Sequence, residues 1–81
     1  MFRKLVKATQ IDVEGTQYTL RFYELKTTRG GRRFSCEVQL TPADRVILDD
    51  DSISSLESKV ARLAPATVYS RLLASKPPFA A

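Results

Sequence analysis

The chain has 81 residues, a hydrophobic fraction of 43%, a charged fraction of 27% and a formal net charge of +4. This size and balance predict one small globular domain with a thin core, and they exclude a disordered chain. With one cysteine and no histidine, a single chain can form neither a disulfide framework nor a zinc site of the usual Cys/His type. We therefore expect no metal, no cofactor and a cytoplasmic location.

The first ten residues contain a basic cluster, Arg3, Lys4 and Lys7. They include no apolar signal-peptide core, and no apolar run in the chain approaches the length of a membrane span, so we expect no membrane partner. Thirteen Lys and Arg residues stand against nine Asp and Glu residues. This mildly basic balance favours an anionic partner over a cationic one.

Two glycine-containing breaks divide residues 9–40 into two successive β-hairpins. The first break is Gly15-Thr16 and the second is Gly30-Gly31. Glycine accepts the positive φ angles that a two-residue hairpin loop requires. Residues 34–40 then alternate apolar and polar side chains, the clearest period-2 pattern of the sequence. This pattern predicts three antiparallel strands joined as a meander.

The middle strand changes phase between Phe22 and Tyr23. Apolar residues occupy even positions up to Phe22 and odd positions from Tyr23 onward. Both sets share one core face only if a β-bulge near this pair shifts the strand by one residue. Otherwise one of the two aromatic residues stays on the outer face, where it is a candidate contact residue.

A loop at Gly30-Gly31 places Leu25 opposite Cys36 and Tyr23 opposite Val38. This register predicts a nearly neutral outer sheet face. Its charged residues would be Arg21, Lys26, Arg33, Asp12, Glu14, Glu24 and Glu37. Glu24 and Glu37 would lie opposite each other as a solvated pair. A sheet that lies broadly on nucleic acid needs a positive surface, so we do not expect this face to bind it.

The segment after Leu40 predicts a turn, a fourth strand and a helix. "TPAD" is typical of a turn, "RVILDD" of a short strand, and Asp51 or Ser52 of a helix N-cap. Apolar residues then follow at helical spacing. Pro65 fits the first turn of a second helix better than the interior of the first.

The predicted fold is α+β: a four-stranded antiparallel β-meander with one face covered by one or two C-terminal helices. Residues 1–76 form this single domain, and residues 77–81 form a flexible C-terminal tail.

Enzyme motifs are missing from the sequence. It contains no phosphate loop, no nucleophile elbow and no histidine to act as a general base. Cys36 lies mid-strand on the predicted core face, where a thiol is usually inert. Asp49-Asp50-Asp51 lacks the ligand spacing of a calcium loop and instead suits the start of a helix. We therefore predict a protein that is not an enzyme.

The densest basic cluster lies at the tip of the second hairpin and comprises Lys26, Arg29, Arg32 and Arg33. Guanidinium and ammonium groups are suited to phosphate contacts. We predict a small binding module that contacts nucleic acid weakly and without sequence specificity through this tip. The tip has no aromatic residue of its own for base stacking.

The alternative is a protein–protein interaction or self-assembling domain that uses a sheet edge or the C-terminal helix. The helix residues for this role are Val68, Tyr69, Leu72 and Leu73. Apolar surface beyond what the sheet can cover favours a protein partner or a homodimer. The sequence alone leaves the nucleic-acid and the protein hypotheses both open.

Overall fold

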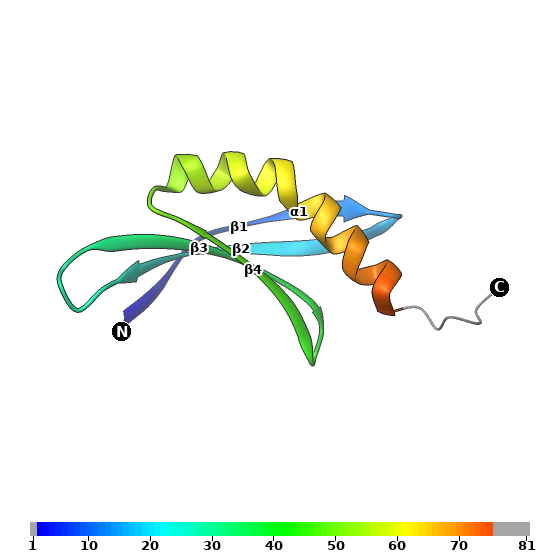
Figure 1. Ribbon diagram of the computed structural model, residues 1–81, viewed down its shortest axis with the longest axis horizontal. Coiled ribbons are helices and arrows are strands. Elements are labelled where there is room, and N and C mark those ends of the chain that lie inside the picture. Colours follow the sequence, from blue (N-terminus) through cyan, green and yellow to red (C-terminus); the bar gives the residue numbers. More distant parts are fainter. Residues whose placement is uncertain (1, 76–81) are drawn as a thin grey trace.

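The computed structural model describes residues 2–75, which form four strands and one helix in the order of the chain (Figure 1). These elements are β1 (Phe2–Val13), β2 (Thr16–Lys26), β3 (Arg32–Thr41), β4 (Asp44–Asp50) and α1 (Ile53–Ser75). The sheet order is β1-β2-β3-β4 and every neighbouring pair is antiparallel. The predicted α+β meander is therefore confirmed, with one helix. The expected tail at residues 77–81 lies outside the described residues.

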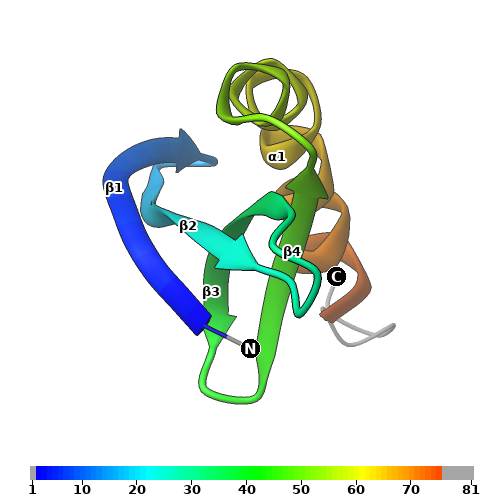
Figure 2. The same ribbon diagram turned by 90° about the vertical axis from the view of Figure 1, so that its left-hand side faces the viewer.

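The hydrophobic core lies between α1 and one face of the sheet. The helix contributes Leu56, Val60, Ala64 and Val68, each 3% exposed or less. Their spacing of four residues forms a stripe along one side of the helix. The sheet contributes buried side chains from all four strands, namely Val13, Leu20, Phe22, Cys36, Val38 and Val46. Viewed along its length, the sheet is strongly curled, with β1 and β4 as its edges (Figure 2).

The first hairpin turns one residue earlier than Gly15-Thr16 predicts. Val13 pairs with Thr16, so the loop is Glu14-Gly15, with φ angles of 54° and 80°. Positive φ at both positions is typical of a type I′ turn, which matches the twist of the strands. The left-handed conformation costs about 1–2 kcal/mol at Glu14, which is why glutamate gave no turn signal. The Gly15 N–H donates to Asp12 Oδ1 over 3.2 Å and supports the turn.

The second hairpin has a longer loop than Gly30-Gly31 predicts. Lys26 pairs with Arg32, and the residues between them form the loop. Thr27 closes this loop: its carbonyl accepts from Gly30 N–H over 3.0 Å and its Oγ1 accepts from Gly31 N–H over 3.0 Å. Within this loop Gly30 has a positive φ, of 81°, and Gly31 does not. The predicted register of β2 against β3 is therefore wrong.

The β-bulge lies on β1 instead of β2. The register of β1 shifts between Leu5 and Lys7, opposite Phe22 and Tyr23, while β2 alternates without interruption. Phe22 is buried in the core at 3% exposure. Tyr23 therefore points to the outer face, as the alternative interpretation required. β1 absorbs the irregularity because it is an edge strand with only one neighbour to satisfy.

The helix is continuous across Pro65, which does not start a second helix. Ser52 is its N-cap, because Ser52 Oγ accepts from the Ser55 N–H over 3.2 Å. Proline lacks the N–H that would bond to Ala61 and crowds that carbonyl, which favours a kink. The helix changes direction near its middle, where its colour passes from yellow to orange (Figure 1). In the described part of the chain, no helix is both long and apolar enough to cross a membrane.

Candidate nucleic-acid interface

Three of the four predicted tip residues stay together at the loop end of the second hairpin. Lys26 and Arg32 face each other as the last pair of β2 and β3. Arg29 lies exposed in the loop between them. This end of the hairpin extends beyond the start of α1 (Figure 1). Two of the three cations therefore lie on paired strands and the third on the loop that joins them, at an end of the hairpin that projects past the start of the helix.

Arg33 is separated from the other three. It pairs with Leu25 on the opposite face of the sheet, and its guanidinium lies 3.1 Å from Asp49 and also bonds to Asp51. The Asp49 hydrogen bond and the Asp51 charge raise the pKa of Arg33 above its ordinary value. Its charge is compensated, so the structure gives it the role of tying β3 to the junction between β4 and α1.

Lys4 takes the place of Arg33 as the fourth cation near the loop end of the second hairpin. The sequence suggested no link between Lys4 and the hairpin, because the first predicted strand began near residue 9. In the structure β1 begins at Phe2, so Lys4 pairs with Glu24, two residues from Lys26 along β2. Lys4, Lys26 and Arg32 line one hollow of about 550 Å³, with Glu24 as the acidic member of its lining. We call Lys4, Lys26, Arg29 and Arg32 the basic end.

The acidic run Asp49-Asp50-Asp51 is used within the fold. Asp49 and Asp51 bind Arg33, and Asp50 lies 3.6 Å from Lys59. The Asp51 backbone N–H, which donates to Asp50 over 2.7 Å, and the charge of Lys59 lower the pKa of Asp50. Within residues 2–75, no three potential ligands cluster around a metal position.

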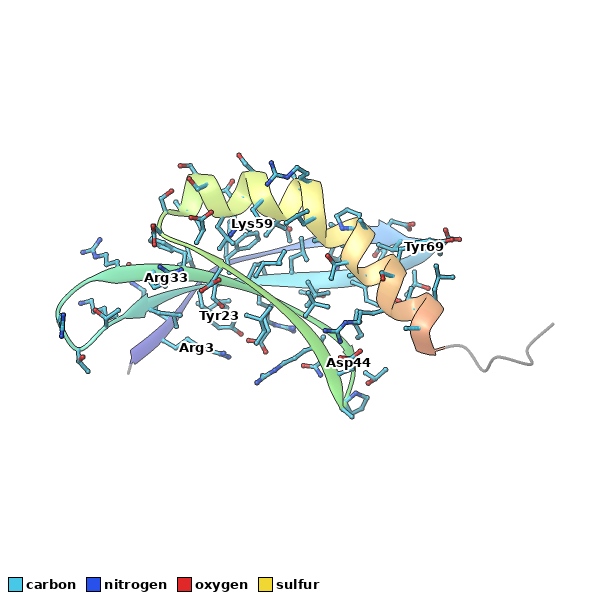
Figure 3. The ribbon with its side chains drawn as sticks, in the orientation of Figure 1. Arg3, Tyr23, Arg33, Asp44, Lys59 and Tyr69 are labelled. Atoms are coloured by element: carbon cyan, nitrogen blue, oxygen red, sulfur yellow. The ribbon has the colours of Figure 1, made fainter. Side chains whose placement is uncertain are left out.

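The outer sheet face carries an ordered network centred on Glu37. One carboxylate oxygen accepts from Arg3 and the other from Arg45, each over 2.9 Å. The Glu37 side chain is only 11% exposed, although it lies on the face away from the helix. The Arg3 guanidinium also covers the Tyr23 ring at 3.9 Å from the centroid. Figure 3 shows Arg3 and Tyr23 together on the side of the sheet opposite α1.

The charge of this outer face differs from the prediction. The observed register places on it Arg3, Arg21, Arg33, Arg45, Asp12, Glu37 and Asp49. Four cations against three anions give +1, whereas the predicted set, with three cations and four anions, gave −1. Glu24 and Lys26 lie on the helix-facing side, so Glu24 does not face Glu37. The centre of the face is basic, because Arg21 is the cross-strand neighbour of Glu37 and joins Arg3 and Arg45 there.

An apolar groove of about 270 Å³ runs between α1 and the first hairpin. Its lining includes Leu20, Phe22, Val60 and Pro65. Lys7 spans it, with its ammonium 3.2 Å from Glu57 and 5.0 Å from the centroid of the Phe22 ring. The charge of Lys7 is thereby compensated, and Lys7 does not extend the basic end.

The four helix residues proposed for protein contact divide into two pairs. Val68 is fully buried and Leu72 is partly buried against the core. Tyr69 and Leu73 are 42% and 47% exposed, and Leu63, which the hypothesis did not include, is 38% exposed. The surplus apolar surface is therefore smaller than the sequence predicted.

Comparisons with protein-family models, with curated proteins and with solved structures found no match to this chain. The functional argument therefore depends on the geometry and chemistry of its own residues.

Proposed function

We propose that this protein is a non-enzymatic binding module that contacts the phosphates of nucleic acid through its basic end. The observation that carries the proposal is the convergence of Lys4 with Lys26 and Arg32 around one hollow, with Arg29 at the adjoining loop tip. Three cations against Glu24 leave the lining with a net charge of +2. A concave positive site attracts anions more strongly than the same charges spread over a convex surface.

The residues of the basic end are suited to phosphate oxygens. The arginines present planar arrays of N–H donors, and the lysines add point charges. Three of the four cations lie on paired strands, so binding loses less backbone entropy than at a free terminus. The basic end provides no Asn or Gln amide placed to read adenine, so its contribution to affinity should be independent of sequence.

Two features of the chain support the further proposals that the protein is not an enzyme and that it works in the cytoplasm. The absence of histidine and the burial of Cys36 favour binding without catalysis. A single buried thiol also suits a reducing compartment such as the cytoplasm.

The test is a titration of the protein with short oligonucleotides over a series of salt concentrations. Contacts from the four cations to four phosphates should give a slope of log affinity against log salt of about −2.8 for single strands and −3.6 for duplex DNA. Lys26→Ser combined with Arg32→Ser should weaken binding and halve the slope, to about −1.4 and −1.8 respectively.

A matched control removes the same net charge elsewhere. Arg62→Asp lowers the net charge by the same two units at one exposed position of α1 and should leave the slope unchanged. Equal weakening by Arg62→Asp and by the Lys26 and Arg32 double variant would mean that only net charge matters, and no binding by the wild type at low salt would contradict the proposal. Arg33 stays unchanged in every variant because its loss would release Asp49 and Asp51.

The second candidate function is protein interaction through the exposed side of α1. Leu63, Tyr69 and Leu73 are the observation that favours it. These side chains cover less surface than a stable interface needs, which places this candidate behind nucleic-acid binding.

A further inference from the structure

The stacked pair of Arg3 and Tyr23 on the outer sheet face has a geometry that phosphate binding does not require. The guanidinium carbon lies 3.9 Å from the ring centroid, which is the distance of a cation–π contact. The Arg3 side chain nevertheless remains 48% exposed. The guanidinium carbon therefore lies over the Tyr23 ring, while about half of the Arg3 side-chain surface stays accessible to a ligand.

We infer that a nucleobase of a single-stranded nucleic acid stacks on the open face of the Arg3 guanidinium. Guanidinium planes and aromatic rings are the groups on which proteins stack unpaired bases. A base inside a duplex is already stacked on its neighbours, so this contact selects single strands. The inference rests on the proposed nucleic-acid binding and specifies its substrate class.

Glu37 is the residue that prepares Arg3 for this role. Its Oε2 accepts from Arg3 Nη1 over 2.9 Å, and its Oε1 is held by Arg45 at the same distance. The carboxylate is almost buried and both of its oxygens accept hydrogen bonds, so its own position is fixed. Glu37 and the Tyr23 ring together therefore restrict the position of the Arg3 guanidinium. A pre-oriented group loses less conformational entropy when a ligand binds.

The surroundings of Arg3 suit both the charged phosphate and the apolar base of a nucleotide. Arg21 and Arg45 place two more cations around Glu37, so three arginines face one acid at the centre of this surface. Leu5 and Ile47 are each 52% exposed and lie on the same face. Apolar side chains beside cations match the alternation of base and phosphate along a single strand.

This surface also adjoins the basic end. Arg3 and Lys4 are consecutive on the edge strand β1, so their side chains lie on opposite faces of the sheet. A strand whose phosphates contact Lys4 can pass around the edge of β1 and place a base on Arg3.

The experiment compares a short oligothymidylate with an abasic oligomer of the same length and the same number of phosphates. The wild type should bind the oligothymidylate about tenfold more tightly, as expected for one stacked base. Arg3→Lys keeps the charge but removes the plane, so it should abolish this preference while affinity for the abasic oligomer stays unchanged. The Arg3 Nε–H proton resonance should shift upfield when the oligothymidylate binds and not when the abasic oligomer binds.

Arg62→Lys is the matched control, because Arg62 is an exposed arginine of α1 that belongs to neither candidate surface, and it should retain the preference. Equal affinity of the wild type for both oligomers, or an unchanged preference in Arg3→Lys, would overturn the stacking site and leave the phosphate contacts standing. If the wild type binds neither oligomer, the proposed function fails and the stacking site fails with it.

Discussion

At the scale of single residues, neighbours decide which charges are available to a ligand. Arg33 and Lys7 appeared in the sequence as members of basic clusters, yet each is paired with carboxylates. Exposed ion pairs of this kind contribute about 0–1 kcal/mol each, so their main consequence is the removal of free charge. Lys4 shows the opposite case, since its pairing with Glu24 brings it into the hollow that Lys26 and Arg32 also line.

Cys36 provides a prediction at the same scale. It is 1% exposed, and burial, together with the nearby Glu37 charge, raises the pKa of its thiol from 9.0 to about 11. Thiolate is the reactive form, so we expect iodoacetamide to label the native protein far more slowly than the urea-unfolded chain at neutral pH. A native rate within a few-fold of the unfolded rate would contradict the burial of this thiol.

The same shift makes a contribution to the pH dependence of stability. Well below pH 9 the thiol is protonated in both the folded and the unfolded state, so it causes no change of the free energy of unfolding with pH. Between about pH 9 and pH 11 the unfolded thiol loses its proton first, so the free energy of unfolding should fall with rising pH. Denaturant titrations across this range should show a smaller fall for Cys36→Ala, and an identical fall would mean that Cys36 is not its source.

At the scale of elements, two irregularities determine the shape of the domain. The bulge on β1 between Leu5 and Lys7 shifts its register, which puts Arg3 on the outer face and Lys4 on the inner one. The second half of α1 runs in a different direction from the first half (Figure 2), and Pro65 inside the helix accounts for this bend. Val68 and Leu72, which follow the bend, still reach the core. The helix therefore packs along its length despite the missing backbone bond.

Pro65→Ala tests how much the proline at the bend lowers the free energy of unfolding. Proline inside a helix is about 3 kcal/mol less favourable than alanine, and part of this is offset because proline also restricts the unfolded chain. We expect a rise of about 1–2 kcal/mol in the free energy of unfolding, measured with urea. Ser58→Ala, an exposed helix position, should give no more than about 0.5 kcal/mol. A loss of stability in Pro65→Ala would mean that the core needs the bend.

At the scale of the whole molecule, one helix covers one face of the sheet and leaves the other to the solvent. The core is continuous from Val13 in β1 to Val68 in α1. The inner face also carries the basic end, where the second hairpin projects past the helix, and the outer face carries the network around Glu37. The two candidate surfaces therefore lie on opposite faces of the sheet and meet at β1, where Arg3 and Lys4 are consecutive.

The oligomeric state separates the two candidate functions. Because Val68 and Leu72 pack inside one chain, we expect a monomer in sedimentation at all accessible concentrations. Tyr69→Glu combined with Leu73→Glu should change neither the mass nor, beyond about 0.5 kcal/mol, the stability. Val68→Glu should unfold the protein, since it buries an unpaired charge. A dimer that the Tyr69 and Leu73 variant dissociates would instead support protein interaction.

Local chemistry in the sequence was enough to predict the kind of each element. Alternation predicted the strands, the apolar spacing with an N-cap at Asp51 or Ser52 predicted the start of the helix, and the position of Cys36 predicted its burial. These features depend on backbone preferences and on the choice between core and solvent, which neighbouring residues determine.

Register and charge pairing were decided only by the tertiary structure. Glu14 takes a positive φ that its residue type does not indicate, and the loop closed by Thr27 is longer than its two glycines suggest. A shift of register changes which residues meet across strands, and Glu24 thus moved away from Glu37. Whether Arg33 is paired and whether Lys4 reaches Lys26 depend on strands distant in sequence. Such contacts follow from the packing of the whole sheet, and no local pattern records them.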